Sequence, residues 1–416
     1  PSLCLDGITT MGNWILSCDI CAQDCSRIGT GMFEYDSQTS EDEDDEEDTF
    51  ESQKSIDVRD LHEKYASARV DHILPLNVAP FENNDFNIRP DELIVSDICT
   101  AKGSFGYVYE GFWKRQVVAV KIQQLPEEEV ELSNLKSELS FMRSIEHENL
   151  VHFSGAFRIE PPLPEAANLP FTNVTGFGIV MEYCQVGDLD SVRLKVASGE
   201  VELCWALRLR IAREIATALR YLHEREIIHR DVKSQNILLD NNWTTKLCDL
   251  GVAVAMDADF RLEYTGGTEC MMAPEQLLGM EYSVPVDIFS MGLVFLELTT
   301  LKKVGDASFM ERLPNNNFEC DVDEIRGASP ADAPPSFVEL IVQCCDGDPD
   351  NRPSADDAVA WIEDLEASEN LPLTIPPAGG HRSVFEATSN LSSKLVRKTR
   401  ARMKKQRETM LQSGVQ

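Results

Sequence analysis

The chain contains 416 residues, of which 43% are hydrophobic, and carries a formal net charge of −33 at pH 7. This length and hydrophobic content suit one globular core with extensions, whereas the strong negative charge argues against nucleic acid as a partner of the main part of the chain. Twelve cysteines, most of them scattered, favour free thiols in a reducing compartment. We expect a cytoplasmic location and no membrane partner, because neither a cleavable signal peptide nor a membrane span is evident. Since the sequence begins at Pro1, we expect a fragment or a processed product.

The first segment, residues 1–35, contains a group of four cysteines. Cys18 and Cys21 have the spacing of a zinc knuckle. With Cys4 and Cys25 they would supply four thiolates, which is enough for a tetrahedral structural zinc site. Because zinc modules usually supply their ligands as two close pairs, a truncated module that lacks its other half is an equally good interpretation.

Residues 36–91 are predicted to form an acidic, disordered linker. Residues 41–48 are an unbroken run of Asp and Glu within a polar stretch, and such a run stays solvated. The functional alternative is a docking site for basic partners or for the chain's own C-terminal tail.

Two predicted strands, 93–98 and 108–112, flank a loop that contains glycine. The loop includes Ala101, Gly103, Ser104, Phe105 and Gly106. Its glycines would allow backbone amides to approach phosphate oxygens. Glycines in a hairpin are more often simple turn residues, but a further strand follows at the distance expected after a phosphate-binding loop, which favours the functional interpretation.

That further strand is predicted at 117–122, where a period of two places Lys121 on the same face as Ala119. In the helix predicted after it, at 132–145, Glu138 lies within the apolar stripe. A carboxylate in that position is costly unless it meets a cation. We therefore expect Glu138 to pair with Lys121.

The most informative motif is 229–236, His-Arg-Asp-Val-Lys-Ser-Gln-Asn, which Asp249-Leu250-Gly251 follows. Asp231 is a candidate proton acceptor, and Lys233 can offset the charge of a departing phosphate. Asn236 and Asp249 provide the hard oxygen ligands that magnesium prefers. These parts could move a phosphoryl group from ATP to a hydroxyl, whereas a solvated polar loop is the alternative for the first motif alone.

These motifs give residues 92–368 a resemblance to the eukaryotic protein kinase domain, and most closely to the tyrosine-kinase-like group that includes the Raf and mixed-lineage kinases. The resemblance is carried by Ala119-Val120-Lys121, Glu138, His147-Glu148-Asn149-Leu150-Val151, 229–236, Asp249-Leu250-Gly251, Gly267-Thr268, Met272-Ala273-Pro274-Glu275, Asp287 and Arg352. It implies a bilobal α+β fold with a small β-rich N-lobe, 92–183, and a larger helical C-lobe, 184–368. It also implies that ATP and Mg²⁺ take part.

The resemblance assigns roles around the nucleotide. Met181 would be the gatekeeper, and the adenine would meet the hinge formed by Glu182, Tyr183 and Cys184. The residues enclosing the ring would be Val108, Ala119 and Leu238. The regulatory spine would consist of Met142, Phe153, His229 and Leu250. The thiol of Cys248, directly before Asp249, should lie near the back of this pocket.

Substrate class follows from the same resemblance. Lys233 and the pair Gly267-Thr268 imply transfer to serine or threonine hydroxyls of a protein substrate. The alternative is a pseudokinase that acts as a scaffold and binds partners through its tails. We favour the enzyme because the chain retains all of the residues that pseudokinases commonly lose, Lys121, Glu138, Asp231, Asn236 and Asp249.

Four residues depart from the family pattern. Ala101 replaces the first glycine of the phosphate loop, and Leu250 replaces the usual Phe. Met271 and Cys345 stand where tryptophans are common. The last two changes put the substrate-docking loop and the packing of the lower lobe in question, but none of the four removes a group that the chemistry needs.

In the C-lobe, the resemblance implies an ion pair between Glu275 and Arg352 that braces the lobe. Asp287 opens an almost wholly apolar run to Leu301. The run is too short for a membrane span and contains Glu297 as well, so we predict a buried central helix.

The chain is predicted to end in a Pro/Gly-rich linker, 369–380, and a basic tail, 381–416. The tail contains nine Lys or Arg residues and two Glu residues, a net charge of +7. We expect it to be solvated and partly helical. The functional alternatives are a nuclear-localisation signal or a patch for anionic lipid or an acidic partner.

The activation segment, from Asp249 to Glu275, offers Tyr264, Thr265 and Thr268 as hydroxyl groups. Arg230, beside the catalytic Asp, could pair with a phosphate on this segment after an upstream kinase has acted. The resemblance implies that Thr268 hydrogen-bonds beside Asp231 instead, so Thr265 is the preferred phosphosite and Tyr264 the second choice.

We predict that Thr265→Ala lowers phosphotransfer while nucleotide binding persists, because a phosphate adds up to about two negative charges that would order the segment. Phosphosite mapping combined with activity and nucleotide-binding assays tests this. Full activity of the alanine variant under activating conditions would show that control lies elsewhere.

Overall fold

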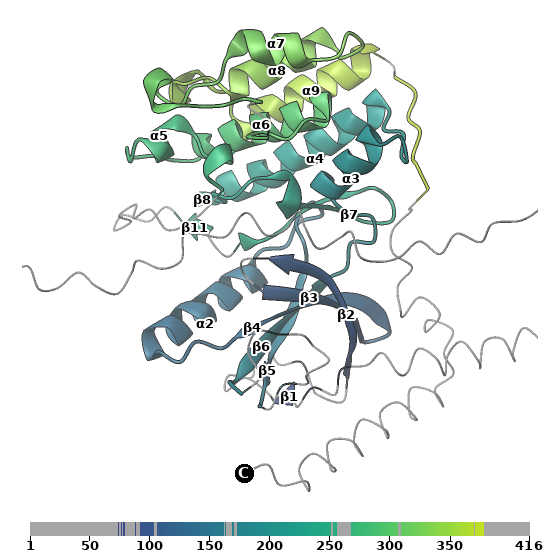
Figure 1. Ribbon diagram of the computed structural model, residues 1–416, viewed down its shortest axis with the longest axis vertical. Helices are drawn as coiled ribbons and strands as arrows, with labels where there is room; N and C mark the ends of the chain where they lie inside the picture. The colour runs from purple at the N-terminus through teal and green to yellow at the C-terminus, as the bar shows by residue number, and fades with distance from the viewer. Residues whose placement is uncertain are drawn as a thin grey trace, which may run out of the picture. The chain divides into compact units, whose positions relative to one another are not determined.

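The computed structural model describes residues 74, 76, 78–79, 88, 92–103, 106–161, 163, 169, 173–250, 253–255, 268–306, 309–369 and 371–377. All of them belong to one unit of the chain, Asp57–Gln416. They form a curled β-sheet accompanied by one long helix, and a second lobe built mainly of helices (Figure 1). The predicted bilobal α+β fold is confirmed.

The N-lobe is a mainly antiparallel meander with one helix. Its elements are β1 (Val78–Ala79), β2 (Leu93–Gly103), β3 (Gly106–Trp113), β4 (Gln116–Gln124), α2 (Glu129–Ser144), β5 (Phe153–Ile159) and β6 (Gly176–Glu182). The strands lie in the order β1-β5-β6-β4-β3-β2. On β4, Val118, Val120 and Ile122 pack into the N-lobe core. Because side chains alternate along a strand, Ala119 and Lys121 share the other face, as predicted.

The N-lobe core begins earlier than expected, so the disordered linker predicted over 36–91 is wrong for its last part. β1 pairs with β5 at the edge of the sheet. Leu74, Leu76, Val78 and Ile88 are buried in the same core cluster. The first three are each separated by one residue, and this period of two is a strand signal that covers one face. The acidic composition upstream concealed it.

The C-lobe consists of helices and short strands. The helices are α3 (Leu189–Ala197), α4 (Trp205–His223), α5 (Pro274–Leu277), α6 (Pro285–Thr300), α7 (Val322–Ala328), α8 (Pro335–Cys344) and α9 (Ala355–Glu369). The strands are β7 (Gly187–Asp188), β8 (Ile227–Ile228), β9 (Ile237–Leu239), β10 (Thr245–Leu247) and β11 (Val254–Ala255). Single 3₁₀ turns occur at Ser234–Asn236, Glu269–Met271, Pro314–Asn316 and Pro349–Asn351.

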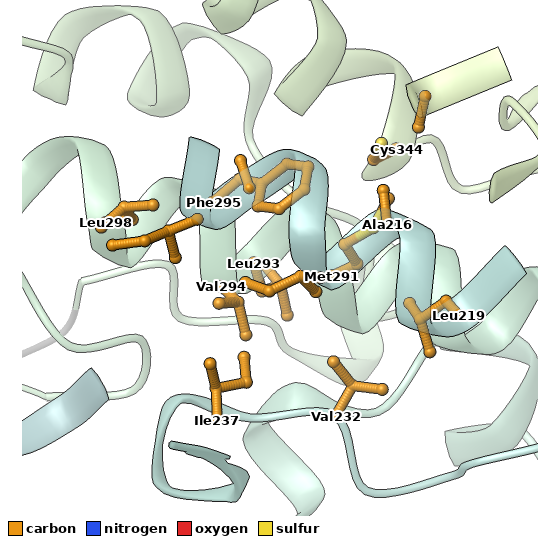
Figure 2. Close-up of a cluster of buried hydrophobic side chains, with 14 of the residues drawn as sticks. Ala216, Leu219, Val232, Ile237, Met291, Leu293, Val294, Phe295, Leu298 and Cys344 are labelled. Atoms are coloured by element: carbon orange, nitrogen blue, oxygen red, sulfur yellow. The ribbon is translucent and has the colours of Figure 1, made fainter. Parts of the chain in front are cut away.

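Helix α6 lies in the centre of the C-lobe core. Every residue from Val286 to Thr299 is buried. Side chains of α4, of α8 and of Ile237 at the start of β9 lie around the helix (Figure 2). A helix that is apolar on all sides must be enclosed by protein or lipid. The buried central helix predicted for this run is therefore confirmed. No helix in the described part of the chain is long and apolar enough to cross a bilayer.

The chain beyond α9 is partly attached to the C-lobe, which corrects the linker predicted over 369–380. Glu369 is still the last residue of α9. Residues 371–377 run along the lobe without regular structure (Figure 1). The indole N–H of Trp243 donates to the carbonyl of Pro376 at 2.9 Å, and the backbone N–H of Thr374 lies 3.4 Å from the Cys204 sulfur. Composition suggested a free linker, but these tertiary contacts hold it.

A buried ion pair joins two segments of the C-lobe that are 77 residues apart in the sequence. Arg352 donates to both carboxylate oxygens of Glu275, at 2.7 and 2.9 Å. The arginine side chain is 0% exposed and the glutamate 6%. Arg352 also donates to the carbonyls of Pro285 and Asp346, at 3.0 and 2.8 Å. One guanidinium thus ties α5 and the start of α6 to the loop before α9.

We predict that Arg352→Met lowers the free energy of unfolding by about 3–5 kcal/mol, because it leaves a buried carboxylate without its cation. Denaturant unfolding followed by circular dichroism measures this. Arg326→Met is the control, since Arg326 pairs with Glu339 on the surface, where the two side chains are 52% and 46% exposed, and such pairs contribute at most about 1 kcal/mol. Equal effects of the two changes would contradict the structural role of Arg352.

Candidate active site

The loop between β8 and β9 gathers the central polar group of the site. The side chain of Asp231 is 4% exposed, and one of its oxygens, Oδ2, lies 2.7 Å from the Lys233 ammonium and accepts from the Asn236 amide at 2.8 Å. Its other oxygen, Oδ1, accepts from the Thr268 hydroxyl at 2.9 Å. Lys233 also donates to the Thr268 hydroxyl at 2.8 Å. These four residues form one closed hydrogen-bonded group, which we call the catalytic group, and it fixes the Asp231 carboxylate at both oxygens.

A second buried carboxylate holds the backbone of this loop. Asp287, on α6, accepts from the backbone N–H groups of His229 and Arg230, both at 2.8 Å, and lies 2.9 Å from the ring of His223. Arg230 has a φ of 66°, a conformation that residues with a side chain seldom adopt. The bond from Arg230 to Asp287 stabilises this turn directly before Asp231.

The pKa of Asp287 reflects this role. Its side chain is 1% exposed, and burial by itself would raise the pKa, but the hydrogen bond and charge of His223 and the backbone N–H of His229 oppose the burial, and the pKa lies below its ordinary value. The folded state therefore favours the charged form. The stability that Asp287 contributes is complete above its unfolded pKa and is lost as the pH falls through the lower, folded pKa.

His229 links the catalytic loop to the strand that leads to Asp249. Its Nδ1 accepts from the backbone N–H of Asp231 at 3.3 Å, so the ring proton resides on Nε2, which lies 3.0 Å from the carbonyl of Cys248. The backbone N–H of Cys248 donates in turn to the carbonyl of Asn236 at 2.9 Å. Burial raises the pKa of the Cys248 thiol to about 12, so this thiol would react slowly with an electrophile.

Lys121 reaches from β4 to the C-lobe. Its ammonium lies 3.4 Å from Oδ1 of Asp249. Between the described residues Lys121 and Glu138 no ion pair forms, which differs from the pairing expected from sequence. Burial raises the pKa of Glu138, and the charge of Lys121 partly opposes that rise. Both carboxylates therefore lie close enough to Lys121 to be influenced by its charge. In this structure the lysine forms its ion pair with Asp249.

The strands of the N-lobe align the remaining nucleotide-site residues in two rows. One row, across β2, β3 and β4, places Ala101 opposite Val108 and Val108 opposite Lys121. The next row places Ala119 opposite Met181. Gly103 pairs with Gly106 at the end of the hairpin. These registers bring the predicted loop, ring-enclosing and phosphate-contacting residues onto neighbouring strands.

A glycine is required at 106. Its φ is +133°, and a Cβ there would lie 2.7 Å from the carbonyl oxygen of Ile122. Any side chain would therefore collide with the backbone of β4. The glycine allows the hairpin to close directly beside the strand of Lys121.

The predicted hinge follows β6. Glu182 is the last residue of β6, and its carboxylate lies 3.0 Å from the Lys246 ammonium. Cys184 is buried, and burial raises the pKa of its thiol. Leu238 lies on β9 opposite Asp188 of β7. The Glu182 side chain is thus engaged with β10 and is not directed to an adenine by this contact.

Several predicted residues lie outside the described part of the chain. They are Ser104 and Phe105 of the phosphate loop, Gly251, Tyr264, Thr265 and Gly267 of the activation segment, and Cys4, Cys18, Cys21 and Cys25 of the first segment. Their roles remain predictions.

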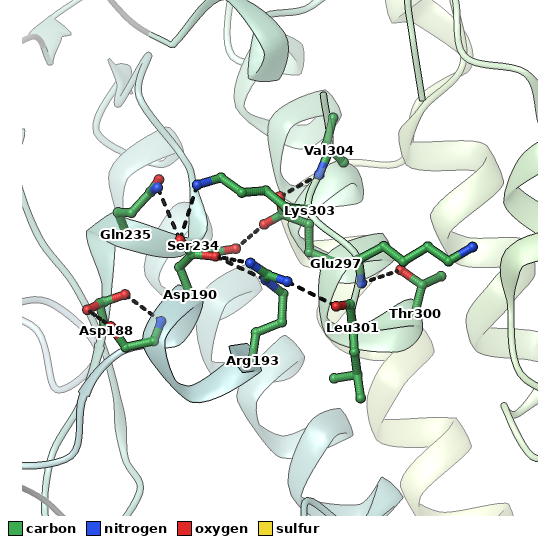
Figure 3. A network of polar contacts seen from close by, with 12 residues as sticks. Asp188, Asp190, Arg193, Ser234, Gln235, Glu297, Thr300, Leu301, Lys303 and Val304 are labelled. Carbon is green, nitrogen blue, oxygen red and sulfur yellow. Dashed lines mark hydrogen bonds and ion pairs between the residues drawn. The ribbon is translucent and has the colours of Figure 1, made fainter. Parts of the chain in front are cut away.

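A polar network beside the catalytic group was not identified from the sequence. Asp190, on α3, accepts from Arg193 at 2.7 Å, from Lys303 at 3.2 Å and from Gln235 at 3.3 Å (Figure 3). Ser234 directly precedes Gln235, and its hydroxyl donates to the buried carboxylate of Glu297. The network attaches the catalytic loop to α3 and α6. The sequence signal was Glu297 within an apolar run, since a buried carboxylate requires partners.

Comparison with known proteins agrees with this geometry. The family model described as "Protein kinase domain" matches residues 101–361. A probable serine/threonine-protein kinase of Dictyostelium discoideum is 37% identical over 288 residues, which are 68% of this chain and 63% of that protein. A second such kinase from the same organism is 36% identical over 275 residues, 66% of this chain and 41% of that protein. A RasGEF domain-containing serine/threonine-protein kinase X is 32% identical over 286 residues, 68% of this chain and 27% of that protein.

The chain belongs to the protein kinase domain family, because the family model covers more than half of it. It spans less than two thirds of the length of these curated relatives. The family implies ATP as substrate and Mg²⁺ as its companion ion.

The residues present fit a magnesium ion. Asn236 uses its amide nitrogen for Asp231, and its Oδ1 accepts no hydrogen bond from the described residues, which leaves an oxygen for a cation. Asp249 supplies a carboxylate. Magnesium takes few protein carboxylates and completes its shell with water and phosphate oxygens. The described ranges contain no group of three or more His, Cys, Asp or Glu side chains that could hold a metal ion. They therefore give no support to a structural zinc site.

We predict that Thr268→Val lowers kcat by about 10- to 100-fold, because it removes a hydroxyl that bonds two charged groups, and each such bond contributes about 1.5–3 kcal/mol. Thr268→Ser keeps the hydroxyl and should retain most of the activity. Steady-state phosphorylation assays and thermal melts of both variants measure this. A valine variant with the kcat of the parent would remove Thr268 from the catalytic group.

Proposed function

We propose that this chain is an active, ATP-dependent serine/threonine kinase that transfers the γ-phosphoryl group to hydroxyls of protein substrates. The observation that carries the proposal is the catalytic group, in which Lys233, Asn236 and Thr268 hold the Asp231 carboxylate at hydrogen-bond distance. An arrangement that fixes both oxygens of one carboxylate suits proton removal from an incoming hydroxyl.

Each residue has a defined task in this mechanism. Asp231 accepts the proton of the substrate hydroxyl as attack begins. Lys233 offers its ammonium to the negative charge that develops on the transferred phosphoryl group, and Thr268 keeps that ammonium beside Asp231. Lys121 holds ATP through its phosphates, and Asn236 with Asp249 would hold Mg²⁺. When bound, Mg²⁺ would offset the negative charge of the phosphate groups.

Serine/threonine specificity is supported by the Lys233–Thr268 contact at 2.8 Å. The lysine lies two residues after Asp231, where tyrosine kinases usually carry a different residue. The printed names of the relatives agree with this substrate class.

The pseudokinase scaffold is the less favoured alternative. Lys121, Asp231, Asn236 and Asp249 are all present, and they lie in positions that suit catalysis. Departures from the family pattern, such as Ala101 and Leu250, leave these groups unchanged. Scaffold activity through the tails would be compatible with catalysis and does not exclude it.

Further parts of the proposal rest on sequence. We place the chain in the tyrosine-kinase-like group, in the cytoplasm, and under control of an upstream kinase that acts on Thr265. Arg230, whose backbone is fixed by Asp287, would receive the phosphate. The basic tail could direct part of the population to the nucleus, and the first four cysteines could bind zinc.

We predict that Asp231→Asn lowers kcat by about 10²- to 10⁴-fold with little change in nucleotide affinity, because it removes the proton acceptor and keeps the size of the side chain. Lys121→Met should instead weaken ATP binding as well as turnover. Radiolabelled phosphate transfer to a generic basic protein, with ATP and magnesium, and nucleotide titrations measure both.

Equal rates for Asp231→Asn and the parent, at equal ATP occupancy, would exclude Asp231 as the base. Complete absence of transfer by the parent chain under the same conditions would favour the scaffold.

A further inference from the structure

Lys303 lies beside the catalytic loop, in the segment that follows α6, and has no task in the transfer mechanism. Its ammonium is 3.2 Å from Oδ2 of Asp190, and the Gln235 amide donates to the same oxygen at 3.3 Å (Figure 3). Lys303 and Gln235 are therefore neighbours at one carboxylate oxygen. Gln235 directly precedes Asn236, whose amide donates to the Asp231 carboxylate at 2.8 Å. A short series of contacts thus links Lys303 to the catalytic group.

The segment that follows α6 also lies against the turn after Thr268. A Cβ on Gly305 would be 3.2 Å from Cβ of Cys270, which belongs to that turn. The backbone N–H of Val304 donates to Glu297 at 2.9 Å, so the segment is fixed to α6 by a buried contact. The segment therefore touches residues that flank the catalytic group at two separate places.

The charge of Lys303 is in excess over that of its partner. Oδ1 of Asp190 accepts from Nη2 and Nε of Arg193 at 2.7 and 3.0 Å, so the arginine already offsets the charge of this carboxylate. The Arg193 side chain is 8% exposed, whereas that of Lys303 is 32% exposed. An ammonium has three N–H donors, and those of Lys303 that do not face Asp190 can be offered to a ligand.

Other acids of this region form no ion pair with Lys303 within the described part of the chain. Asp188 accepts the hydrogen bonds that cap α3, at 2.8 and 2.7 Å. Glu297 is buried and accepts from its own donors. Glu269 and Asp306 are exposed and lie beyond ion-pair distance of the ammonium. The exposed part of the cluster formed by Asp190, Arg193, Gln235 and Lys303 therefore presents a cation.

Lys303 is within reach of the residues that flank an accepting hydroxyl. The hydroxyl must come to Asp231 during attack, and the exposed Gln235 lies one residue from the Asp231 ligand Asn236. An extended peptide advances about 3.3 Å per residue, so three or four residues cover about 10–13 Å. A side chain within four residues of the acceptor can therefore meet the Lys303 ammonium.

We propose that Lys303 selects an acidic side chain at one position near the accepting serine or threonine of the substrate. A carboxylate there would accept from the Lys303 ammonium. An arginine or lysine there would meet two cations, Lys303 and Arg193, beside an acid whose two oxygens already accept from protein donors. This inference rests on the proposed function and adds to it the charge of the substrate segment.

The selection is tested by a peptide scan with the full chain. A peptide with one serine and neutral flanking residues is compared with versions that carry a single Asp or a single Arg at each of the four positions on either side. Attraction and repulsion at a partly exposed charge should each change kcat/KM by about 2- to 5-fold, mainly through KM. For the parent chain we therefore expect one position at which Asp exceeds Arg by about 4- to 25-fold.

Lys303→Glu should invert this preference at the same position, and Lys303→Met, which only removes the charge, should bring the ratio of Asp to Arg close to one. The ratio is taken within each variant, so a general loss of activity cancels, and thermal melts establish that each variant folds. A purely structural role of Lys303 would change the turnover of all peptides by the same factor.

Lys302→Glu is the matched control. Lys302 is the neighbouring lysine and is exposed, but its ammonium lies 5.1 Å from the centre of the Phe309 ring instead of at Asp190. This variant should keep the ratio of the parent at every position.

A ratio of Asp to Arg that neither Lys303 variant changes would overturn the proposal. A preference of the parent for Arg at the position that responds to Lys303 would overturn it as well. Transfer to the neutral peptide separates the two hypotheses, because transfer without any charge effect leaves the proposed function standing and rejects the role of Lys303. The absence of transfer to every peptide would reject the proposed function and this inference together.

Discussion

The position of the catalytic loop depends on Asp287, one of two buried carboxylates in the mainly apolar helix α6. Helix α6 is enclosed on all sides by the C-lobe core, so the charge of Asp287 must be satisfied by neighbouring donors. The available donors are the backbone N–H groups of His229 and Arg230 and the ring of His223. Because Asp287 must accept from these two backbone N–H groups, it fixes the backbone at His229 and Arg230. Asp231 directly follows Arg230 and is positioned by the same contacts.

Further hydrogen bonds connect the catalytic loop to neighbouring segments. His229 joins the loop to Cys248, and Ser234 joins it to Glu297, the second acid of α6. Both acids therefore bind parts of the same loop, although the burial of Glu297 raises its pKa and the donors around Asp287 lower that of Asp287. The difference follows from the partners, since Asp287 has three, including the His223 ring, whereas Glu297 accepts from the Ser234 hydroxyl and the backbone N–H of Val304.

The ion pair of Lys121 with Asp249, which joins the lobes at the site, is more exposed than the ion pair within the C-lobe. Lys121 meets Asp249 at 3.4 Å, with side chains 17% and 24% exposed, whereas Arg352 and Glu275 are almost wholly buried. Glu138 lies near enough to feel the same lysine. A lysine between two carboxylates can exchange partners at small cost, because each arrangement keeps one ion pair. The N-lobe side of the site is thus adjustable, while the C-lobe side is fixed by buried contacts.

The sequence by itself determined the fold class, the family and the residues of the catalytic group, because their types and spacing are set by the chemistry of phosphoryl transfer. It also determined that α6 is a buried helix, because an apolar run with two acids has few other interpretations. Tertiary structure decided what local patterns do not encode. Leu74, Leu76 and Val78 are buried in the N-lobe core, residues 371–377 contact Cys204 and Trp243, and Lys121 paired with Asp249 rather than Glu138.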